Sequence, residues 1–88
     1  MGRVQVLVPA ALRQYWGGGA KVDVEARTVA EALGSLGSLT SRVLDDTGRV
    51  RRHVHVFLNQ SAVSDIRAPL SDGDVIHILP AVSGGSRS

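Results

Sequence analysis

The stretch of sequence that decides the fold reads Leu70-Ser71-Asp72-Gly73-Asp74-Val75-Ile76-His77-Ile78-Leu79-Pro80. Asp72-Gly73 is a turn signal, because an aspartate side chain hydrogen-bonds its own backbone and glycine tolerates a positive φ. The apolar run 75–79 predicts a short strand. Pro80 predicts the end of that strand, because proline has no N–H to donate to a sheet. We therefore expect a tight turn and then a strand close to the C-terminus.

Two segments near the N-terminus predict a β-hairpin. Residues 3–8 and 20–26 both alternate between apolar and other side chains, which is typical of half-buried strands. The glycine-rich loop between them fits an antiparallel connection. We expect residues 10–16 to be a connection between the two strands.

The middle of the chain predicts one main helix. Thr28 and Glu31 form a capping box, in which the Thr28 hydroxyl accepts from the Glu31 amide and Glu31 reaches back to the Thr28 amide. Gly37 is expected to end the helix, and residues 40–44 can add one more turn. The apolar positions at helical spacing are Val29, Ala32, Leu33 and Leu36.

The remaining elements complete the predicted order β-β-α-β-(β)-β. Residues 53–58 alternate like a strand, and residues 62–63 predict a short edge strand. One helix on one face of a mixed sheet is the smallest two-layer α+β solution. We predict a β-grasp domain over residues 1–82, with four to five strands and the last strand in the middle beside the first. Residues 83–88 are expected to be a flexible tail.

Composition excludes several classes of function. The chain has 88 residues and no cysteine, which excludes disulfides, thiolate metal sites and cysteine nucleophiles. No apolar run approaches the ~20 residues of a membrane span, and no signal-peptide pattern is present. These observations predict a cytoplasmic protein without a membrane partner. No catalytic constellation is visible, so we do not expect an enzyme.

The basic residues do not predict a nucleic-acid partner. The net charge is only +2, and a single Phe, Trp and Tyr offer no stacking platform for single strands. The one basic cluster is Arg49, Arg51 and Arg52. Two interpretations of this cluster stay open, a solvated entry to a strand and a docking patch for an acidic partner.

Three histidines are expected on one side of the sheet, namely His53, His55 and His77. Three imidazoles on one face could bind zinc or nickel. Exposed sheet residues are the alternative, and no carboxylate that would orient the imidazoles is evident. We therefore do not predict a metal site.

The face of the sheet that the helix leaves uncovered carries apolar residues. They are Leu7, Phe57, Val75 and Leu79, with Pro80 at the end of the last strand. An apolar patch on an uncovered sheet face is typical of a partner-binding surface.

The sequence also resembles the MoaD/ThiS family of ubiquitin-like sulfur carriers, and within it the CysO-like branch. The resemblance spans residues 3–85, and its specific part is Asp72-Gly73-Asp74 together with Ile78-Leu79-Pro80-Ala81-Val82-Ser83-Gly84-Gly85. It implies a protein that is monomeric alone, binds no cofactor tightly and is acted on by partner enzymes.

The resemblance implies a mechanism that centres on Gly85. An E1-like adenylyltransferase adenylates the Gly85 carboxylate with ATP, and a sulfur donor then replaces AMP to give a thiocarboxylate. That sulfur passes to a biosynthetic enzyme that makes cysteine, thiamin, molybdopterin or a sulfur-containing natural product. The narrow tail that enters the partner is formed by Ala81, Val82, Ser83 and Gly84.

The chain departs from the family pattern after Gly85, because Ser86-Arg87-Ser88 follow. The resemblance implies that a JAMM-type zinc metalloprotease cuts between Gly85 and Ser86. The alternatives are a β-grasp subunit that docks on a larger enzyme without sulfur chemistry, and a ubiquitin-like modifier that is conjugated through Gly85.

Overall fold

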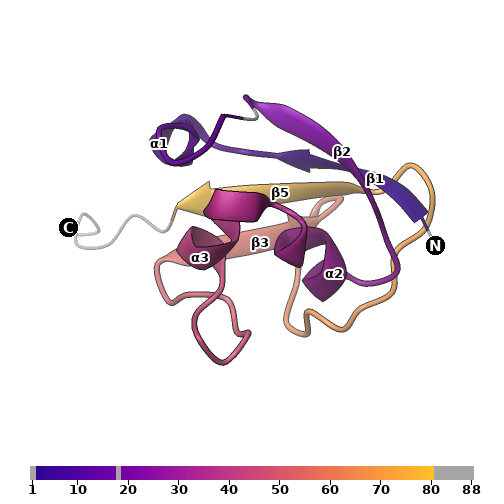
Figure 1. The fold of residues 1–88 in the computed structure, drawn as a ribbon. Coiled ribbons are helices and arrows are strands. Elements are labelled where there is room, and N and C mark those ends of the chain that lie inside the picture. Colours follow the sequence, from indigo (N-terminus) through magenta and orange to yellow (C-terminus); the bar gives the residue numbers. More distant parts are fainter. Residues whose placement is uncertain (1, 18, 81–88) are drawn as a thin grey trace.

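The computed structural model describes residues 2–17 and 19–80. They form a mixed sheet whose strands are joined by short helices (Figure 1). The elements in chain order are β1 (Gly2–Leu7), α1 (Ala10–Arg13), β2 (Lys21–Ala26), α2 (Val29–Gly34), the 3₁₀ helix η1 (Gly37–Leu39), α3 (Thr40–Val43), β3 (Val54–Leu58), β4 (Ser61–Ala62) and β5 (Val75–Pro80).

The strand order in the sheet is β2-β1-β5-β3-β4. β1 and β5 run parallel, while β1–β2, β3–β5 and β3–β4 are antiparallel pairs. The predicted mixed sheet is therefore confirmed, with the last strand in the middle beside the first. This is the β-grasp arrangement that the order of elements predicts.

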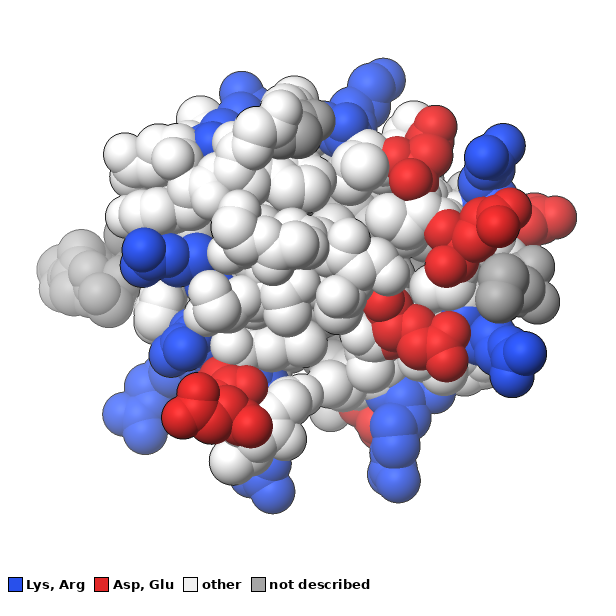
Figure 2. Space-filling view, viewed as in Figure 1, with Lys and Arg blue, Asp and Glu red and all other residues white. Residues whose placement is uncertain are grey.

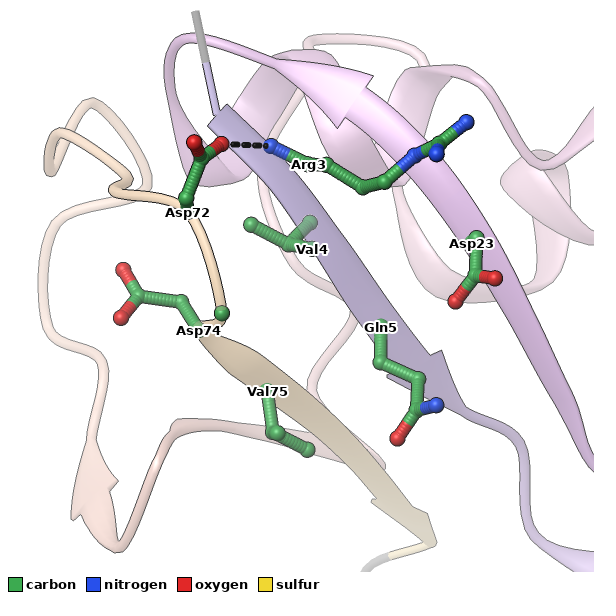
Figure 3. A pocket seen from close by; sticks show the side chains of 8 residues that line it. Arg3, Val4, Gln5, Asp23, Asp72, Asp74 and Val75 are labelled. Carbon is green, nitrogen blue, oxygen red and sulfur yellow. Dashed lines mark hydrogen bonds between the residues drawn. The ribbon is translucent and has the colours of Figure 1, made fainter.

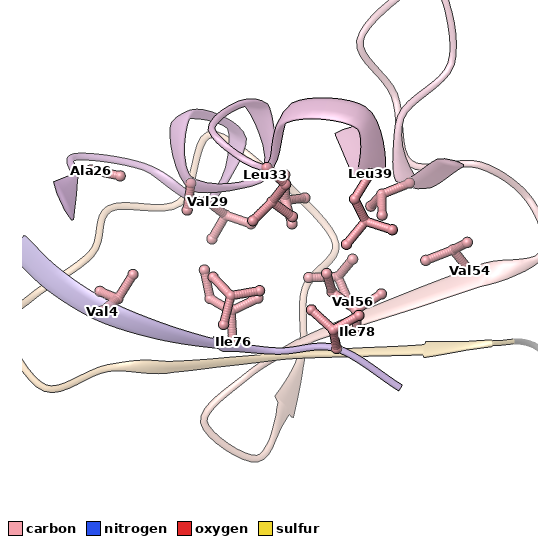
Figure 4. Close-up of a cluster of buried hydrophobic side chains, with 14 of the residues drawn as sticks. Val4, Ala26, Val29, Leu33, Leu39, Val54, Val56, Ile76 and Ile78 are labelled. Carbon is pink, nitrogen blue, oxygen red and sulfur yellow. The ribbon is translucent and has the colours of Figure 1, made fainter. Parts of the chain in front are cut away.

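The core lies between the sheet and the layer of α2, η1 and α3 (Figure 1). Figure 4 shows the side chains of Val4, Ile76 and Ile78 pointing from the sheet toward Leu33 and Leu39. The even-numbered residues of β1 and β5 face inward, because side chains alternate along a strand. Val54 and Val56 of β3 face inward in the same way and are buried.

The turn before β5 holds that strand in place. The Asp72 carboxylate accepts from the Arg3 backbone N–H at 2.7 Å, and the Arg3 carbonyl accepts from the Gly73 N–H at 3.0 Å. Gly73 has a φ of +88°, a conformation that favours glycine. On the other side, Asn59 Oδ1 accepts from the Val75 N–H at 3.0 Å. The turn and the start of β5 are thus bonded to β1 on one side and to the residue that follows β3 on the other.

The connection after β1 differs from the prediction, because residues 10–13 form the helix α1. Leu12 and Trp16, four residues apart, both pack against the core. The Arg13 Nε donates to the Val8 carbonyl at 3.0 Å and ties the helix to the end of β1. Four helical residues are too few to give a periodic signal, although the Leu12–Trp16 spacing hints at one.

The main helix differs from the prediction in two details. The Thr28 hydroxyl caps it by accepting from the Glu31 N–H at 3.2 Å, as predicted, but Glu31 accepts from the Arg27 amide at 2.8 Å rather than from Thr28. The helix ends at Gly34, before Gly37. The added turn predicted for residues 40–44 is confirmed as α3, with Val43 buried.

Candidate docking face and the end of the last strand

One row of side chains crosses the face of the sheet that is opposite the helices. The strand register places Leu7 beside Lys21 on one side and His77 on the other, and Phe57 between His77 and Ala62. Leu7 and Phe57, both partly exposed, therefore flank His77 at the centre of the sheet. The row is apolar except for one lysine and one imidazole.

Leu79 extends this row toward the end of β5. It pairs with His55 and is 43% exposed, which makes it one of two exposed large hydrophobic residues in the described part of the chain. A shallow groove beside it is lined by Leu7, Pro9, Arg13 and Lys21. The apolar surface is thus most exposed where the last strand ends. We call Leu7, Phe57, His77 and Leu79 the docking face.

Val75 lies on the same face but in different surroundings. It pairs with Gln5 at the start of β5 and lines a polar hollow with Arg3, Asp23 and Asp72 (Figure 3). Figure 3 shows Val75 beside Gln5, with Asp72, Asp74 and Asp23 farther away along the same hollow. The apolar character of the face therefore fades from Leu79 toward Val75.

Pro80 lies apart from these residues. Its register partner is Val54, whose side chain is buried under the helices. Partners in a register share a face, so Pro80 belongs to the helix side of the sheet, where it is exposed at the end of β5.

The three histidines do not share one side of the sheet, contrary to the expectation from the sequence. His55 and His77 are on the outer face, whereas His53 precedes β3 in a turn. Within residues 2–17 and 19–80, no three His, Asp or Glu side chains come together in a way that could hold a metal ion.

The residues expected to carry the chemistry lie outside the described part. They are Ala81, Val82, Ser83, Gly84, Gly85 and Ser86, and the end of the predicted domain at residue 82 is also there. The last described residue is Pro80, so the structure locates the point from which the chain continues. No helix in the described part is long and apolar enough to cross a membrane.

The chain as a whole is similar to a group of known proteins. The chain matches the ThiS family over residues 6–85. It is 30% identical to the sulfur carrier protein CysO of Mycobacterium tuberculosis over an alignment of 91 positions, gaps included, that covers 93% of this chain and 98% of that protein. It is 36% identical to small archaeal modifier protein 3 of Haloferax volcanii, over 81% of this chain and 78% of that protein.

A solved structure extends the similarity to three dimensions. A chain in the crystal structure of the Amycolatopsis orientalis BexX/CysO complex superimposes with a TM-score of 0.79 at 30% identity, over 93% of this chain and 99% of that one. The sequence match and the β-grasp sheet thus agree along almost the whole chain. The chain belongs to the ThiS family of ubiquitin-like sulfur carriers.

Proposed function

We propose that this sulfur carrier works through Gly85, which is freed by removal of residues 86–88, adenylated by an E1-like enzyme and converted to a thiocarboxylate. The observation that carries the proposal is the exposed end of β5 beside the docking face, five residues before Gly85. The match to the ThiS family also ends at residue 85. The carrier is a protein substrate of its partners and not a catalyst.

The chemistry explains why a glycine carboxylate needs a partner. A carboxylate is a poor electrophile until one oxygen becomes a good leaving group. Attack of the Gly85 carboxylate on the α-phosphate of ATP forms an acyl-adenylate and releases pyrophosphate. A sulfur nucleophile then displaces AMP and leaves the thiocarboxylate. ATP is bound by the activating enzyme, and the carrier supplies only the acyl group.

The length of the tail sets how deeply the partner's active site can lie. Residues 81–85 span at most about 18 Å when extended, at ~3.3–3.6 Å per residue. Gly84 and Gly85 lack a Cβ, so this arm can enter a narrow channel. A partner seated against the docking face would thus place its ATP within that distance of Pro80.

The docking face supplies most of the affinity in this proposal. Fixing the backbone costs about 1–2 kcal/mol per residue, so ordering five tail residues costs about 5–10 kcal/mol. Full burial of a side chain that starts exposed contributes about 1.5–3 kcal/mol, and Leu79 has 43% of its surface left to bury. The tail alone would bind weakly, and contacts at Leu7, Phe57 and Leu79 offset part of the cost of ordering it.

The sulfur acceptor is a biosynthetic enzyme, and the release of residues 86–88 falls to a JAMM-type zinc metalloprotease. This chain is similar to a CysO that has been solved in a complex with BexX. That similarity supports a partner protein of the kind that binds sulfur carriers. The chain is proposed to act as a monomer in the cytoplasm.

A second candidate function is conjugation to other proteins. The similarity to a small archaeal modifier protein favours it, because transfer of the activated Gly85 acyl group to a lysine amine would give an isopeptide instead of a thiocarboxylate. Adducts of higher mass in the native cell would favour this function. A permanently docked subunit without sulfur chemistry is the remaining alternative.

The deciding experiment is the intact mass of the protein isolated from its native cell. We expect a chain that ends at Gly85, part of it heavier by the difference between one sulfur and one oxygen atom. Treatment with a thiol-reactive alkylating reagent should label that fraction only. A population that always ends at Ser88 would overturn the proposal, because Gly85 would then never have a free carboxylate.

A further inference from the structure

A basic pocket lies beside the end of β5, apart from the docking face. It is lined by Ser41, Arg42, Arg51 and His53, and it lies between α3 and the segment that enters β3. Val54, the residue after His53, pairs with Pro80. The pocket is therefore next to the point from which the chain continues toward Gly85.

Two contacts hold the guanidinium groups of this pocket in position. The Arg51 Nε donates to the Ser41 carbonyl at 2.7 Å, which leaves its two terminal nitrogens free to donate elsewhere. The Arg42 guanidinium carbon lies 3.8 Å from the centre of the Tyr15 ring, a cation–π contact. Less conformational entropy is lost on binding when donors are fixed beforehand.

Neither guanidinium forms a close ion pair within the described residues, although the charge of Arg51 acts on Asp45 and helps to lower the pKa of that carboxyl. The ion pair found there joins Arg67 and Asp65, at the other end of the molecule. The nearest acidic loop uses one carboxylate internally, because Asp45 Oδ1 accepts from the Thr47 hydroxyl at 2.6 Å and from the Arg49 N–H at 3.1 Å. Asp45 and Asp46 line the adjoining hollow with Arg51, but no hydrogen bond from either guanidinium of the pocket to a carboxylate is found among the described residues.

The surroundings reinforce the positive charge. Residues 41–53 contain four arginines and two aspartates. Figure 2 shows basic side chains at both ends of the molecule, whereas most acidic side chains lie toward the end opposite the tip of β5 and one acidic group lies among the basic side chains near that tip. A charge distribution of this kind steers an acidic partner toward the positive end.

We infer that the pocket of Ser41, Arg42, Arg51 and His53 binds carboxylates of an acidic segment on the protein that takes up the tail. The inference rests on the proposed function for the identity of the partner. Planar guanidinium groups match carboxylates with two parallel hydrogen bonds. The acidic segment then lies against one side of the end of β5, while the docking face lies on the other.

The openness of the pocket favours a protein segment over a small free anion. Arg42 and His53 are exposed, so a free ion would keep much of its water and bind weakly. A carboxylate carried by a partner that already contacts the docking face has a high effective concentration at the pocket. The pocket would thus add affinity to a complex whose first contacts are made by the docking face, and it would fix the orientation of the partner.

The test is a titration of the ¹⁵N-labelled full-length chain with an octaglutamate peptide, at about 20 mM and about 300 mM salt, because screening separates charge from other contacts. We expect amide shifts centred on residues 41–42 and 51–53 that vanish at high salt. Arg42→Gln and Arg51→Gln should each weaken binding about two- to fivefold, the range for an exposed ion pair. Thermal melting checks that Arg51→Gln still folds.

Two controls make the inference falsifiable. Arg52→Gln removes the same charge next to the pocket without lining it, and Arg27→Gln removes one at the far end. Equal weakening by Arg52→Gln, or shifts spread over the whole basic surface, would show generic charge attraction and overturn the pocket. Inorganic phosphate that produces the same shifts with the same midpoint would overturn an acidic segment as the occupant.

Failure of the proposed function gives a different result. A chain that never ends at Gly85 in the native cell would remove the carrier mechanism, which the mass measurement detects without reference to the pocket. If octaglutamate still produced localised amide shifts in that case, the inference of a carboxylate-binding pocket would stand. If octaglutamate produced no shifts while the thiocarboxylate was found in the native cell, the pocket inference would be wrong and the carrier mechanism would stand.

Discussion

The Asp72 carboxylate accepts a hydrogen bond from the Arg3 backbone N–H at 2.7 Å, across 69 residues of sequence. This bond joins the turn before the last strand to the start of the first strand. It fixes where β5 enters the sheet, and thereby the register that places His77 beside Leu7.

Replacing Asp72 should therefore destabilise the fold. Asp72→Ala leaves the Arg3 N–H without its partner, and we expect a loss of about 1 kcal/mol in the free energy of unfolding, as for a typical hydrogen bond. Urea unfolding measures it. Asp46→Ala, which removes an exposed carboxylate in a loop, is the control and should change little. Equal stabilities of the two variants would contradict the role of this bond.

Gly2 allows a second test of the contact between β1 and the turn before β5, with Gly34 as the comparison. A Cβ on Gly2 would lie 2.8 Å from the Ser71 carbonyl carbon, so Gly2→Ala forces the turn away from β1. We expect a loss of about 1–3 kcal/mol, the usual cost of overpacking. Gly34, in α2, has open space around its Cβ position, and Gly34→Ala should add up to about 1 kcal/mol through helix propensity. Thermal melting of both variants decides, and a stable Gly2→Ala would show that the junction yields.

The strands could be predicted from the sequence because side chains alternate between the two faces of a sheet along each strand. Alternation in residues 3–8, 20–26 and 53–58 identifies the inward side chains, and the Asp72-Gly73 turn marks the start of β5. The outer residues Leu7, Phe57 and Leu79 follow from the same alternation, so the docking face was visible before the structure.

Helix α1 and the assembly of the basic pocket were not predictable, for a physical reason. α1 is four residues long, too short for a periodic signal, and it is held by contacts such as the Arg13 Nε donating to the Val8 carbonyl at 3.0 Å. Ser41 and Arg51 meet because the Leu44–Val50 bridge folds the intervening loop back. No local sequence pattern indicates that the loop between Leu44 and Val50 closes in this way.

Leu79 is the residue through which the docking face can be tested. Leu79→Asp places a charge at the most exposed apolar position of that face, and loss of its burial should lower kcat/KM for adenylation about tenfold or more. ATP–pyrophosphate exchange by the activating enzyme measures the effect. Gln60→Asp adds the same charge in the exposed turn after β3 and should leave the exchange unchanged. Normal adenylation of Leu79→Asp would show that the docking face does not contribute to binding of the activating enzyme.

Asp45 predicts a pH dependence of stability. Hydrogen bonds from the Thr47 hydroxyl, the Arg49 amide and the Thr47 amide lower the pKa of its carboxyl below the ordinary value. A lowered folded-state pKa contributes stability that is fully present above the unfolded pKa of about 3.9 and is lost as pH falls through the folded pKa. Asp45→Ala should thus be less stable than the unmodified chain at neutral pH.

The pH profile separates this effect from simple loss of a loop contact. The difference in the free energy of unfolding between the unmodified chain and Asp45→Ala should shrink as pH falls below about 4. Urea unfolding at a series of pH values measures it, with Asp46→Ala as the matched carboxylate. A difference that stays constant into acid would mean that the ionised carboxylate does not contribute.

Gly84 tests whether the tail and the docking face act separately. Gly84→Leu adds a side chain to the arm that must enter the partner, so we expect adenylation to fall at saturating carrier while the affinity for the activating enzyme changes little. The reason is that the sheet supplies most of the affinity, whereas the tail must pass a narrow channel. Ser83→Ala, which removes only a hydroxyl, is the control. If Gly84→Leu instead weakened binding as strongly as Leu79→Asp, the tail would be an affinity element, and the division of labour proposed between sheet and tail would be wrong.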